Sequence, residues 1–389
     1  MTENFLFLVA VLLLVESVFL ILKKDQNWNH LEIAINCLLG ISNIAIGLLF
    51  TDINLSIYLY FYNNYSFHLE PNNTFLSILF AVVSYDFFYY ISHLVHHKCA
   101  FLWCNHFVHH SGKSYNLSTA VRIGFIGNFT VWIFFLPMAC IGISLENYLI
   151  VILAQVFYQF LLHTTLIPEL GFFEKILVTP SQHRVHHASN NIYLDKNFGC
   201  FFVIWDKIFR TYQREIKEIP VVYGVTTQIS QEYSHGFLNF FMYVNLIISF
   251  IKETSWRKKI LTIFGTPKHI KSSDFYLISY KKQISEKIIE YFIAIFIGLY
   301  LILNFKYFNK IDLITIATLF LIFSSLAGYE IHQKWIKNLS LICITLIQLL
   351  FIIYLTSSYS NYKIITFVVI ILSIMLILSY TYKLTQDNS

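Results

Sequence analysis

One histidine spacing recurs along this chain. The pattern His-x-x-His-His occurs three times, beginning at His93, His106 and His183. With 15 histidines in 389 residues, about 0.02 such copies are expected by chance, so composition does not account for three. Positions i, i+3 and i+4 share one face of a helix, so each copy can direct its imidazoles into one small volume. The three copies therefore predict a site built from several imidazoles.

The residue type and the number of rings indicate a site for two metal ions. Neutral imidazole binds iron, zinc and copper, whereas magnesium prefers oxygen ligands. A tetrahedral ion needs four ligands, so eight or nine imidazoles are too many for one ion. They suit two ions, each with several nitrogen ligands and one position left open for a small molecule.

Alternative roles for the histidines are weaker but stay open. Separate histidines are often satisfied in a core or exposed, and a metal-storage, ion-transport or structural zinc protein would also concentrate imidazoles. The three copies, however, lie beside apolar stretches that can deliver a lipid chain. A ferritin-like di-iron site is excluded, because it needs paired Glu-x-x-His motifs and the chain has one, from Glu232 to His235.

Two residues near the copies are candidates for the same site. Asp86 precedes His93 by seven positions, which is two helical turns on one face. Its carboxylate is expected to accept the second ring N–H and fix the tautomer; the alternative is a polar residue in a hydrated crevice. His163 ends an apolar stretch, where it is either a ninth ligand or an interfacial histidine.

Polar residues beyond the second and third copies are assigned supporting roles. Tyr115, Asn116 and Arg122 are expected either to shape the side of the site that receives a lipid headgroup or a cofactor, or to pack a loop. Asp195 and Asp206 are expected either to orient imidazoles or to pair with the lysine that follows each of them.

The elements that position these residues are predicted to be membrane helices. Hydrophobic residues make up 57% of the chain and charged residues 13%, against about a quarter charged in soluble proteins. The net charge of +5 gives no indication of nucleic acid, and six irregularly spaced cysteines predict reduced thiols. Stretches long and apolar enough to cross a bilayer lie at 4–22, 31–50, 74–92, 123–143, 146–166, 288–304, 311–329, 339–357 and 364–380.

Loop charges predict which side the histidines face. Residues 51–73 contain no Lys or Arg and are expected outside, whereas 167–287 hold 16 of the 27 Lys and Arg and are expected in the cytoplasm. All three copies then lie at one cytoplasmic depth. The apolar stretch 237–251 precedes a basic, Trp-containing segment and predicts a helix in the headgroup layer, with a tenth span as the alternative.

The longer strings around the histidines resemble a known family, the fatty acid hydroxylase (sterol desaturase) superfamily. They are YNLSTAVR at 115–122, TPSQHRVHH at 179–187, DKN at 195–197, WDKIF at 205–209 and VYG at 222–224. Within the superfamily they are closer to the alkylglycerol monooxygenase branch. The resemblance extends over roughly 75–270 and not over the last hundred residues.

This resemblance implies a membrane di-iron monooxygenase that uses O2 to hydroxylate an unactivated C–H bond of a lipid. In the alkylglycerol branch the electron donor is tetrahydrobiopterin, and the hydroxylated carbon is the one next to the ether oxygen. The first family motif, His-x-x-x-His, leaves His96 as an extra histidine. The ligands that it implies are His93, His97, His106, His109, His110, His183, His186 and His187, to which His163 is added as a candidate.

The sequence therefore predicts an all-α, polytopic transmembrane protein with a histidine-rich di-metal cap on the cytoplasmic side. Residues 1–73 are expected to form anchor helices, 74–287 the catalytic domain and 288–389 a four-span membrane block. Asp86, Tyr115 and Asn116 are the candidate catalytic residues. Two iron ions are the expected cofactors, with tetrahydrobiopterin or another electron donor.

The predicted partners are a membrane lipid, O2 and that donor, without nucleic acid; the sequence leaves the oligomeric state open. We expect the endoplasmic reticulum in a eukaryote or the inner membrane in a bacterium. A lipid desaturase on the same di-iron centre and a non-catalytic metal-binding or transport protein are the alternative functions.

Overall fold

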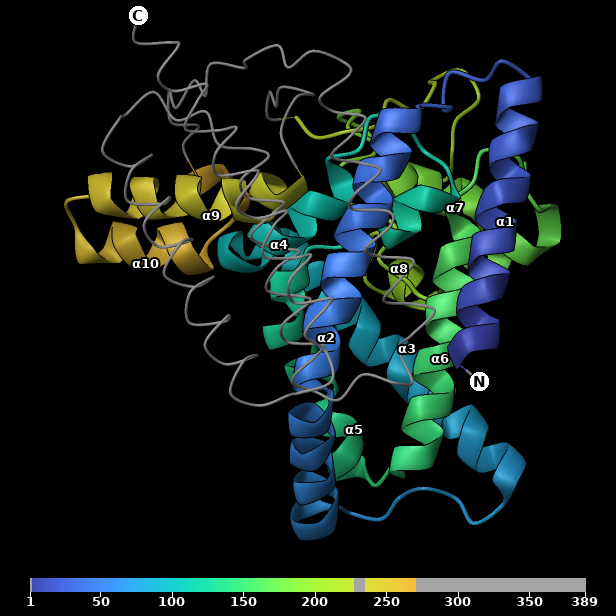
Figure 1. Ribbon diagram of the computed structural model, residues 1–389. Coiled ribbons are helices and arrows are strands. Elements are labelled where there is room, and N and C mark those ends of the chain that lie inside the picture. The colour runs from blue at the N-terminus through green and yellow to red at the C-terminus, as the bar shows by residue number, and fades with distance from the viewer. Residues whose placement is uncertain (1, 227–234, 271–389) are drawn as a thin grey trace, which may run out of the picture. The chain divides into compact units, whose positions relative to one another are not determined.

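The computed structural model describes residues 2–226 and 235–270, which are coloured in Figure 1. These residues are mostly helical and form no strand, with only two isolated bridges, Leu177 to Phe202 and Ala188 to Tyr223. The all-α prediction is confirmed for this part of the chain. The predicted domain boundary at 287 and the four-span block 288–389 lie outside the described residues.

Four long helices form the scaffold, and they are α1 (Thr2–Leu22), α2 (His30–Tyr65), α3 (Thr74–Lys98) and α6 (Leu145–Leu162). Of the helices described, α3 and α6 are long and apolar enough to cross a membrane. They coincide with the predicted spans 74–92 and 146–166. The apolar stretch of α1, Phe7–Leu22, falls below that length.

Helix α2 is longer than the sequence predicts. Residues 51–73 are expected to be an exterior loop, but the helix continues through Tyr65. No Gly or Pro interrupts 51–65, so nothing in this segment ends the helix. At about 1.5 Å per residue its 36 residues extend about 54 Å, well beyond a hydrocarbon core of about 30 Å.

The predicted span 123–143 is wrong as a single helix. It consists of three short pieces, η2 (Phe125–Phe129), η3 (Val131–Phe135) and α5 (Leu136–Ile141). Side chains from elsewhere accept hydrogen bonds from its backbone: Asn105 Oδ1 from Gly127 N at 2.9 Å and Asn239 Oδ1 from Phe125 N at 3.1 Å. A Cβ on Gly127 would lie 2.7 Å from the Asn105 amide, so glycine permits this close approach.

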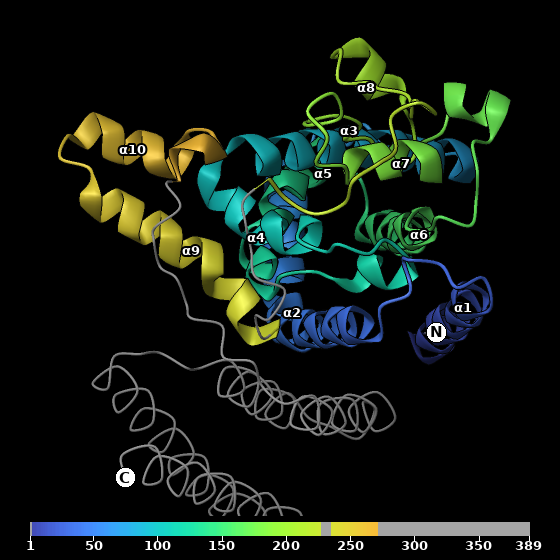
Figure 2. The same cartoon turned by 90° about the horizontal axis from the view of Figure 1, so that it is seen from above.

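The remaining described elements are shorter than α1, α2 and α3, and α4 and α7 among them carry histidines of the second and third copies. They are α4 (Ala100–His110), η1 (Leu117–Val121), η4 (Gly171–Lys175), α7 (Pro180–His186) and α8 (Ile204–Ile208), followed by α9 (His235–Lys252), α10 (Trp256–Phe264) and η5 (Pro267–His269). The predicted headgroup-layer stretch forms α9. Figure 1 shows α9 and α10 running across the direction of α1, α2 and α6. In Figure 2, α4 lies between α9 and α6.

An aromatic core fixes the two candidate spans relative to each other. Tyr148 of α6 stacks on Tyr58 of α2 at 4.4 Å and lies 6.3 Å from Tyr85 of α3, which in turn stacks on Phe135 of η3 at 4.6 Å. These rings are all buried, and the Tyr58 hydroxyl donates to Ile143 O. Because α3 and α6 carry histidines at their carboxyl ends, this core sets the spacing of those histidines.

Candidate metal centre

The structure brings the nine sequence-predicted imidazoles into two groups. Within each group, one ring nitrogen from every member lies within 4.8 Å of the others. The first group is His93, His97, His106, His110 and His186, and the second is His109, His163, His183 and His187. His96 belongs to neither. That these groups bind metal stays a prediction, which the following observations support.

Helical periodicity accounts for how the copies are shared between the groups. In the second copy, His106 and His110 are four residues apart and join the first group, while His109 joins the second. In the third copy the i, i+4 pair His183 and His187 joins the second group, and the residue between them in the motif joins the first. The second and third copies therefore each contribute to both groups, whereas the motif by itself predicts one volume for each copy.

Backbone carbonyls fix the orientation of several rings. A carbonyl accepts from Nδ1, so this nitrogen carries the proton and Nε2 keeps its lone pair for a metal. The tautomer follows from the hydrogen-bond network. The pairs are His93 with Phe198 O at 3.0 Å, His109 with Arg122 O at 3.1 Å, His163 with Gln159 O at 2.7 Å and His186 with Lys196 O at 2.9 Å.

The spacing of the Nε2 atoms fits a cation between them. His109 and His163 both donate through Nδ1, so their Nε2 lone pairs face each other at 3.3 Å. His163 Nε2 also lies 3.2 Å from His187 Nε2 and 3.1 Å from His183 Nε2. Two nitrogens bound at right angles to one ion at about 2.1 Å are about 3 Å apart. The donor set and its geometry thus suit a metal ion.

The first group shows the same property. His93 Nε2 is 3.1 Å from His106 Nε2, which is 3.0 Å from His110 Nε2. The buried Nε2 atoms of His97 and His186 have no hydrogen-bond partner among the described residues. A buried acceptor without a partner costs about 1–3 kcal/mol, and a bound cation would remove that cost.

Electrostatics keeps the rings in the form that binds metal. Burial, followed by repulsion from neighbouring imidazoles, lowers the pKa far below its usual value. This holds outside the candidate spans for His106, His110, His183, His186 and His187. These rings are therefore neutral at neutral pH, so each keeps a nitrogen lone pair that can bind a metal ion without first losing a proton.

Asp86 does not reach the imidazole that the sequence assigned to it. Seven residues along a helix correspond to about 10 Å, so a shared face does not bring the carboxylate to His93. The carboxylate instead accepts from Phe201 N at 2.6 Å and from Trp205 Nε1 at 2.8 Å. The predicted contact with His93 is wrong, and Asp86 anchors the turn at 198–205.

Asp206 anchors the same turn from its other side. Its two oxygens accept from Phe198 N and Gly199 N, each at 2.8 Å, and from the Thr211 hydroxyl. It pairs with neither an imidazole nor the lysine that follows it. Because Phe198 O accepts from His93, the two aspartates orient that ring through the backbone of the turn.

Asp195 orients an imidazole directly. Its Oδ1 lies 3.4 Å from His97 Nδ1, and Oδ2 accepts from Lys98 Nζ at 2.5 Å. Burial raises the pKa of Asp195, but the contacts with His97 and Lys98 outweigh burial and hold that pKa below its usual value. Of the two predicted roles, the structure favours orientation of His97.

Tyr115 and Asn116 lie close to the second group but use their polar atoms elsewhere. The Tyr115 hydroxyl donates to Leu162 O at 3.1 Å, and its ring lies 5.2 Å from that of His187. The Asn116 amide donates to Asn27 O, and its oxygen accepts from Ser118 N. These contacts favour packing and loop capping over the catalytic role predicted for both.

Arg122 also supports the loop. Its guanidinium donates to Val108 O at 2.7 Å and to Asn36 Oδ1 at 2.8 Å, while its own carbonyl accepts from His109. The side chain is buried, so it presents no exposed charge to a headgroup.

Sequence reasoning missed a row of polar residues on α1, α2 and the turn between them that binds the segment 111–118. Glu16 accepts from Leu117 N, and Glu32 accepts from Ser114 N. Asn27 accepts from Tyr115 N. A carboxylate within an apolar stretch is costly, so Glu16 itself was a signal.

Comparison with known proteins covers the same part of the chain. Residues 78–211, which contain all nine histidines, match the family model described as fatty acid hydroxylase. The alkylglycerol monooxygenase of Homo sapiens is 37% identical over 220 residues, covering 56% of this chain and 49% of that protein. The alkylglycerol monooxygenase of Danio rerio is 38% identical over 182 residues, covering 47% and 40%.

A bacterial relative is more distant. The ornithine lipid hydroxylase OlsE of Rhizobium tropici is 27% identical over 163 residues, covering 41% of this chain and 48% of that protein. The chain spans about half the length, or less, of these curated relatives. No solved structure matches it.

Proposed function

Since residues 78–211 form a domain of the fatty acid hydroxylase family, we propose that this protein is a membrane monooxygenase that hydroxylates a C–H bond of a lipid. Two iron ions are its proposed cofactors, one in each histidine group. The observation that carries the proposal is the convergence of nine buried or half-buried imidazoles. Neighbouring Nε2 atoms in each group lie 3.0–3.3 Å apart, which is the spacing of two nitrogen ligands on one metal ion.

Iron suits these donor sets. The first group offers five nitrogens and the second four, so an ion with up to six ligands keeps a position open in each. Bound iron supplies the activation of O2 that insertion of an oxygen atom into an unactivated C–H bond requires. The chain's own residues bind the ions, fix the ring tautomers through carbonyls and exclude water by burial.

A lipid substrate fits both the relatives and the scaffold. The relatives' names refer to an alkylglycerol and an ornithine lipid, and both are lipids. Exposed apolar side chains lie along α3 and α6 in the turns that precede His93 and His163, including Leu79, Val83, Leu153 and Val156. We propose that the substrate chain approaches from the bilayer beside these helices, with the histidines on the cytoplasmic side.

The electron donor is part of the same proposal. Tetrahydrobiopterin, or another two-electron donor, would reduce the centre between turnovers. The Lys98–Asp195 ion pair lies at the edge of the first group, where Asp195 also contacts His97, and it is partly exposed. This edge is therefore accessible to a soluble donor, whereas the second group is more deeply enclosed.

The decisive experiment measures metal and product together. Purified protein should contain two irons per chain, consume O2 with a donor, and add one oxygen to a lipid detected by mass spectrometry. His109→Ala should remove one iron and abolish turnover. His68→Asn is the matched control, because His68 is exposed, lies outside both groups and has a left-handed φ of 51° that Asn tolerates.

Different results would point to the alternative functions. A product with a new double bond and no added oxygen would indicate a lipid desaturase on the same centre. Bound metal without O2 consumption, or turnover retained in His109→Ala, would contradict the oxygenase and favour a metal-binding protein.

A further inference from the structure

Helix α1 places a buried carboxylate beside the second histidine group. Glu16 is only 4% exposed, in a helix that is otherwise almost entirely apolar. Its Oε2 accepts from Leu117 N at 2.6 Å, and its Oε1 accepts from the Thr164 hydroxyl at 2.5 Å. A buried charge is unfavourable unless its hydrogen bonds are made, so these contacts make the position specific.

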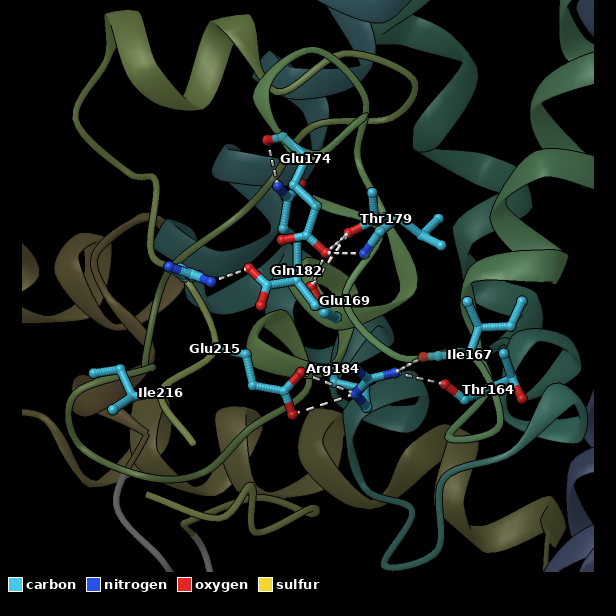
Figure 3. A network of polar contacts seen from close by, with 12 residues as sticks. Thr164, Ile167, Glu169, Glu174, Thr179, Gln182, Arg184, Glu215 and Ile216 are labelled. Carbon is cyan, nitrogen blue, oxygen red and sulfur yellow. Dashed lines mark hydrogen bonds and ion pairs between the residues drawn. The ribbon is translucent and has the colours of Figure 1, made fainter. Parts of the chain in front are cut away.

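The hydrogen bond between Glu16 and Thr164 connects α1 to His163, the central ring of the second group. Thr164 follows His163, whose Nε2 lies 3.1–3.3 Å from three other ring nitrogens. The Thr164 carbonyl accepts from Arg184 Nη1 at 3.0 Å, and Arg184 follows His183 on α7. Figure 3 shows Arg184 held between the carbonyls of Thr164 and Ile167 on one side and Glu215 on the other.

The hydrogen bond between Glu16 and Leu117 N connects α1 to the same group through Tyr115. Leu117 begins η1, directly after the capping residue Asn116. The ring of Tyr115 lies 5.6 Å from that of His163 and 5.2 Å from that of His187, and its hydroxyl donates to Leu162 O. Glu16 thus ties together the two backbone segments that flank the second group.

We infer that Glu16 is a positioning residue for the second metal ion, and that α1 is a structural part of the metal centre as well as an apolar helix. This inference rests on the proposed function, because it requires the second group to bind metal. Glu16 lies outside the family-matched segment 78–211. The first group has its own supports, Phe198 O, Lys196 O and Asp195, which Glu16 does not contact.

Because Glu16 supports the second group and does not contact the residues that support the first, its removal should weaken the binding of one metal ion only. Removal of the carboxylate leaves Leu117 N and the Thr164 hydroxyl without their acceptor and loosens the carboxyl end of α6. Ligands must be held within about 0.5 Å for a metal site to bind well, so His163 should lose its alignment. The second ion should be weakened, while the first should stay bound.

The test is a metal titration of the purified full-length protein with iron alone, read as ions bound per chain. Glu16→Ala should bind one ion as tightly as wild type and the second about 10–100-fold more weakly. Glu16→Gln should restore the second ion, because its amide can accept from Leu117 N and donate to the Thr164 hydroxyl. Thr164→Val should weaken the second ion in the same way, because it removes the hydroxyl that donates to Glu16. This variant tests the inference if Glu16→Ala does not fold.

Double variants identify which ion is lost. Glu16→Ala with His109→Ala should still bind one ion, because both changes act on the second group. Glu16→Ala with His97→Ala, which disrupts the first group, should bind neither ion tightly.

The matched control is Glu70→Ala. Glu70 makes contacts of the same kind, accepting from Ser144 N at 3.0 Å and from the Asn147 amide at the opposite end of α6. It should retain both ions even if the protein is less stable. The inference is overturned if Glu16→Ala and Thr164→Val both keep two ions at wild-type affinity, or if Glu70→Ala loses the second ion equally. A wild-type protein that binds fewer than two ions would refute the proposed function itself.

Discussion

The position of a ring, and not its hydrogen-bond pattern, separates a candidate ligand from a neighbouring histidine. His96 lies one residue before His97, yet its Nδ1 donates to Ser92 O at 2.7 Å and its ring packs 5.6 Å from that of Phe134. Its Nε2 is buried and has no hydrogen-bond partner among the described residues. The ring nitrogens of His96 nevertheless do not converge with those of either group, although the motif includes this residue.

We expect His96→Phe to keep both metal ions, whereas His97→Ala should lose the first. Phenylalanine preserves the ring packing and removes a buried acceptor whose missing partner costs about 1–3 kcal/mol, so thermal stability should not fall. Metal content per chain and the unfolding temperature in detergent measure the two effects. Loss of an ion in His96→Phe would show that His96 is a tenth ligand.

At the scale of elements, the sequence predicted the residues of the site better than the segments that carry them. Eight of the nine histidines follow from a repeated motif and a family resemblance, and His163 from its place at the end of an apolar stretch; all of these are local patterns. Hydropathy predicted one span over 123–143, but it cannot detect that Asn105 and Asn239, distant in sequence, bind its backbone. The role of Asp86 was misassigned because spacing predicts a shared face and not the distance along the axis.

The turn at 198–205 is the element through which Asp86 acts. Asp86→Asn keeps one oxygen for Phe201 N but places an N–H donor against Trp205 Nε1–H, so we expect a loss of about 1–3 kcal/mol in stability. Trp205→Phe removes the opposing donor. The double variant should then be less destabilised than the sum of the two single changes.

Thermal unfolding of the four proteins of this cycle measures the coupling. Additive effects would contradict the direct Asp86–Trp205 contact. Asp86→Asn should also weaken the first ion more than the second, because His93 depends on the carbonyl of the turn.

At the scale of the whole molecule, residues outside the family-matched segment 78–211 support elements within that segment. Helices α1 and α2 support the segment 111–122, and α9 packs on α4 through Phe107, Phe241 and Leu246. These contacts join parts of the chain that are 82 or more residues apart. A local motif does not indicate such long-range contacts, so the sequence predicted only an anchoring role for the first 73 residues.

Helix α10 should lie at the membrane surface. Trp256 is 75% exposed and Phe264 68%, and the basic residues Arg257 and Lys258 are exposed beside them. Aromatic and basic residues together are typical of the headgroup layer. In nanodiscs whose brominated lipids quench nearby tryptophans, Trp256→Phe should lower the fraction of the tryptophan fluorescence that is quenched.

Trp103→Phe is the comparison, since Trp103 packs against His97 and His110 at 5.1 and 5.7 Å. Its removal should increase the quenched fraction of the remaining signal. Equal quenching in wild type and Trp256→Phe would contradict a surface position for α10.

Acid should unfold the metal-free protein as a whole. Burial lowers the pKa of imidazoles in both groups, among them His106, His110, His183, His186 and His187. In the unfolded chain each has a pKa of about 6.5. Below that pH the unfolded state binds more protons than the folded state, so the free energy of unfolding falls as the pH falls.

The loss should begin near pH 6.5 and continue down to the lowered pKa of the folded state, with each group contributing up to about 1.4 kcal/mol per pH unit. Thermal unfolding of metal-free protein at about pH 7.5 and about pH 5.5 measures it, and the midpoint should drop sharply at the lower pH. Added iron should raise the midpoint most at the higher pH, because protons compete with the ion for Nε2. A metal-free midpoint that is equal at both pH values would mean that these rings have the same pKa in the folded and unfolded states, and that the two groups are not the closed, neutral donor sets on which metal binding depends.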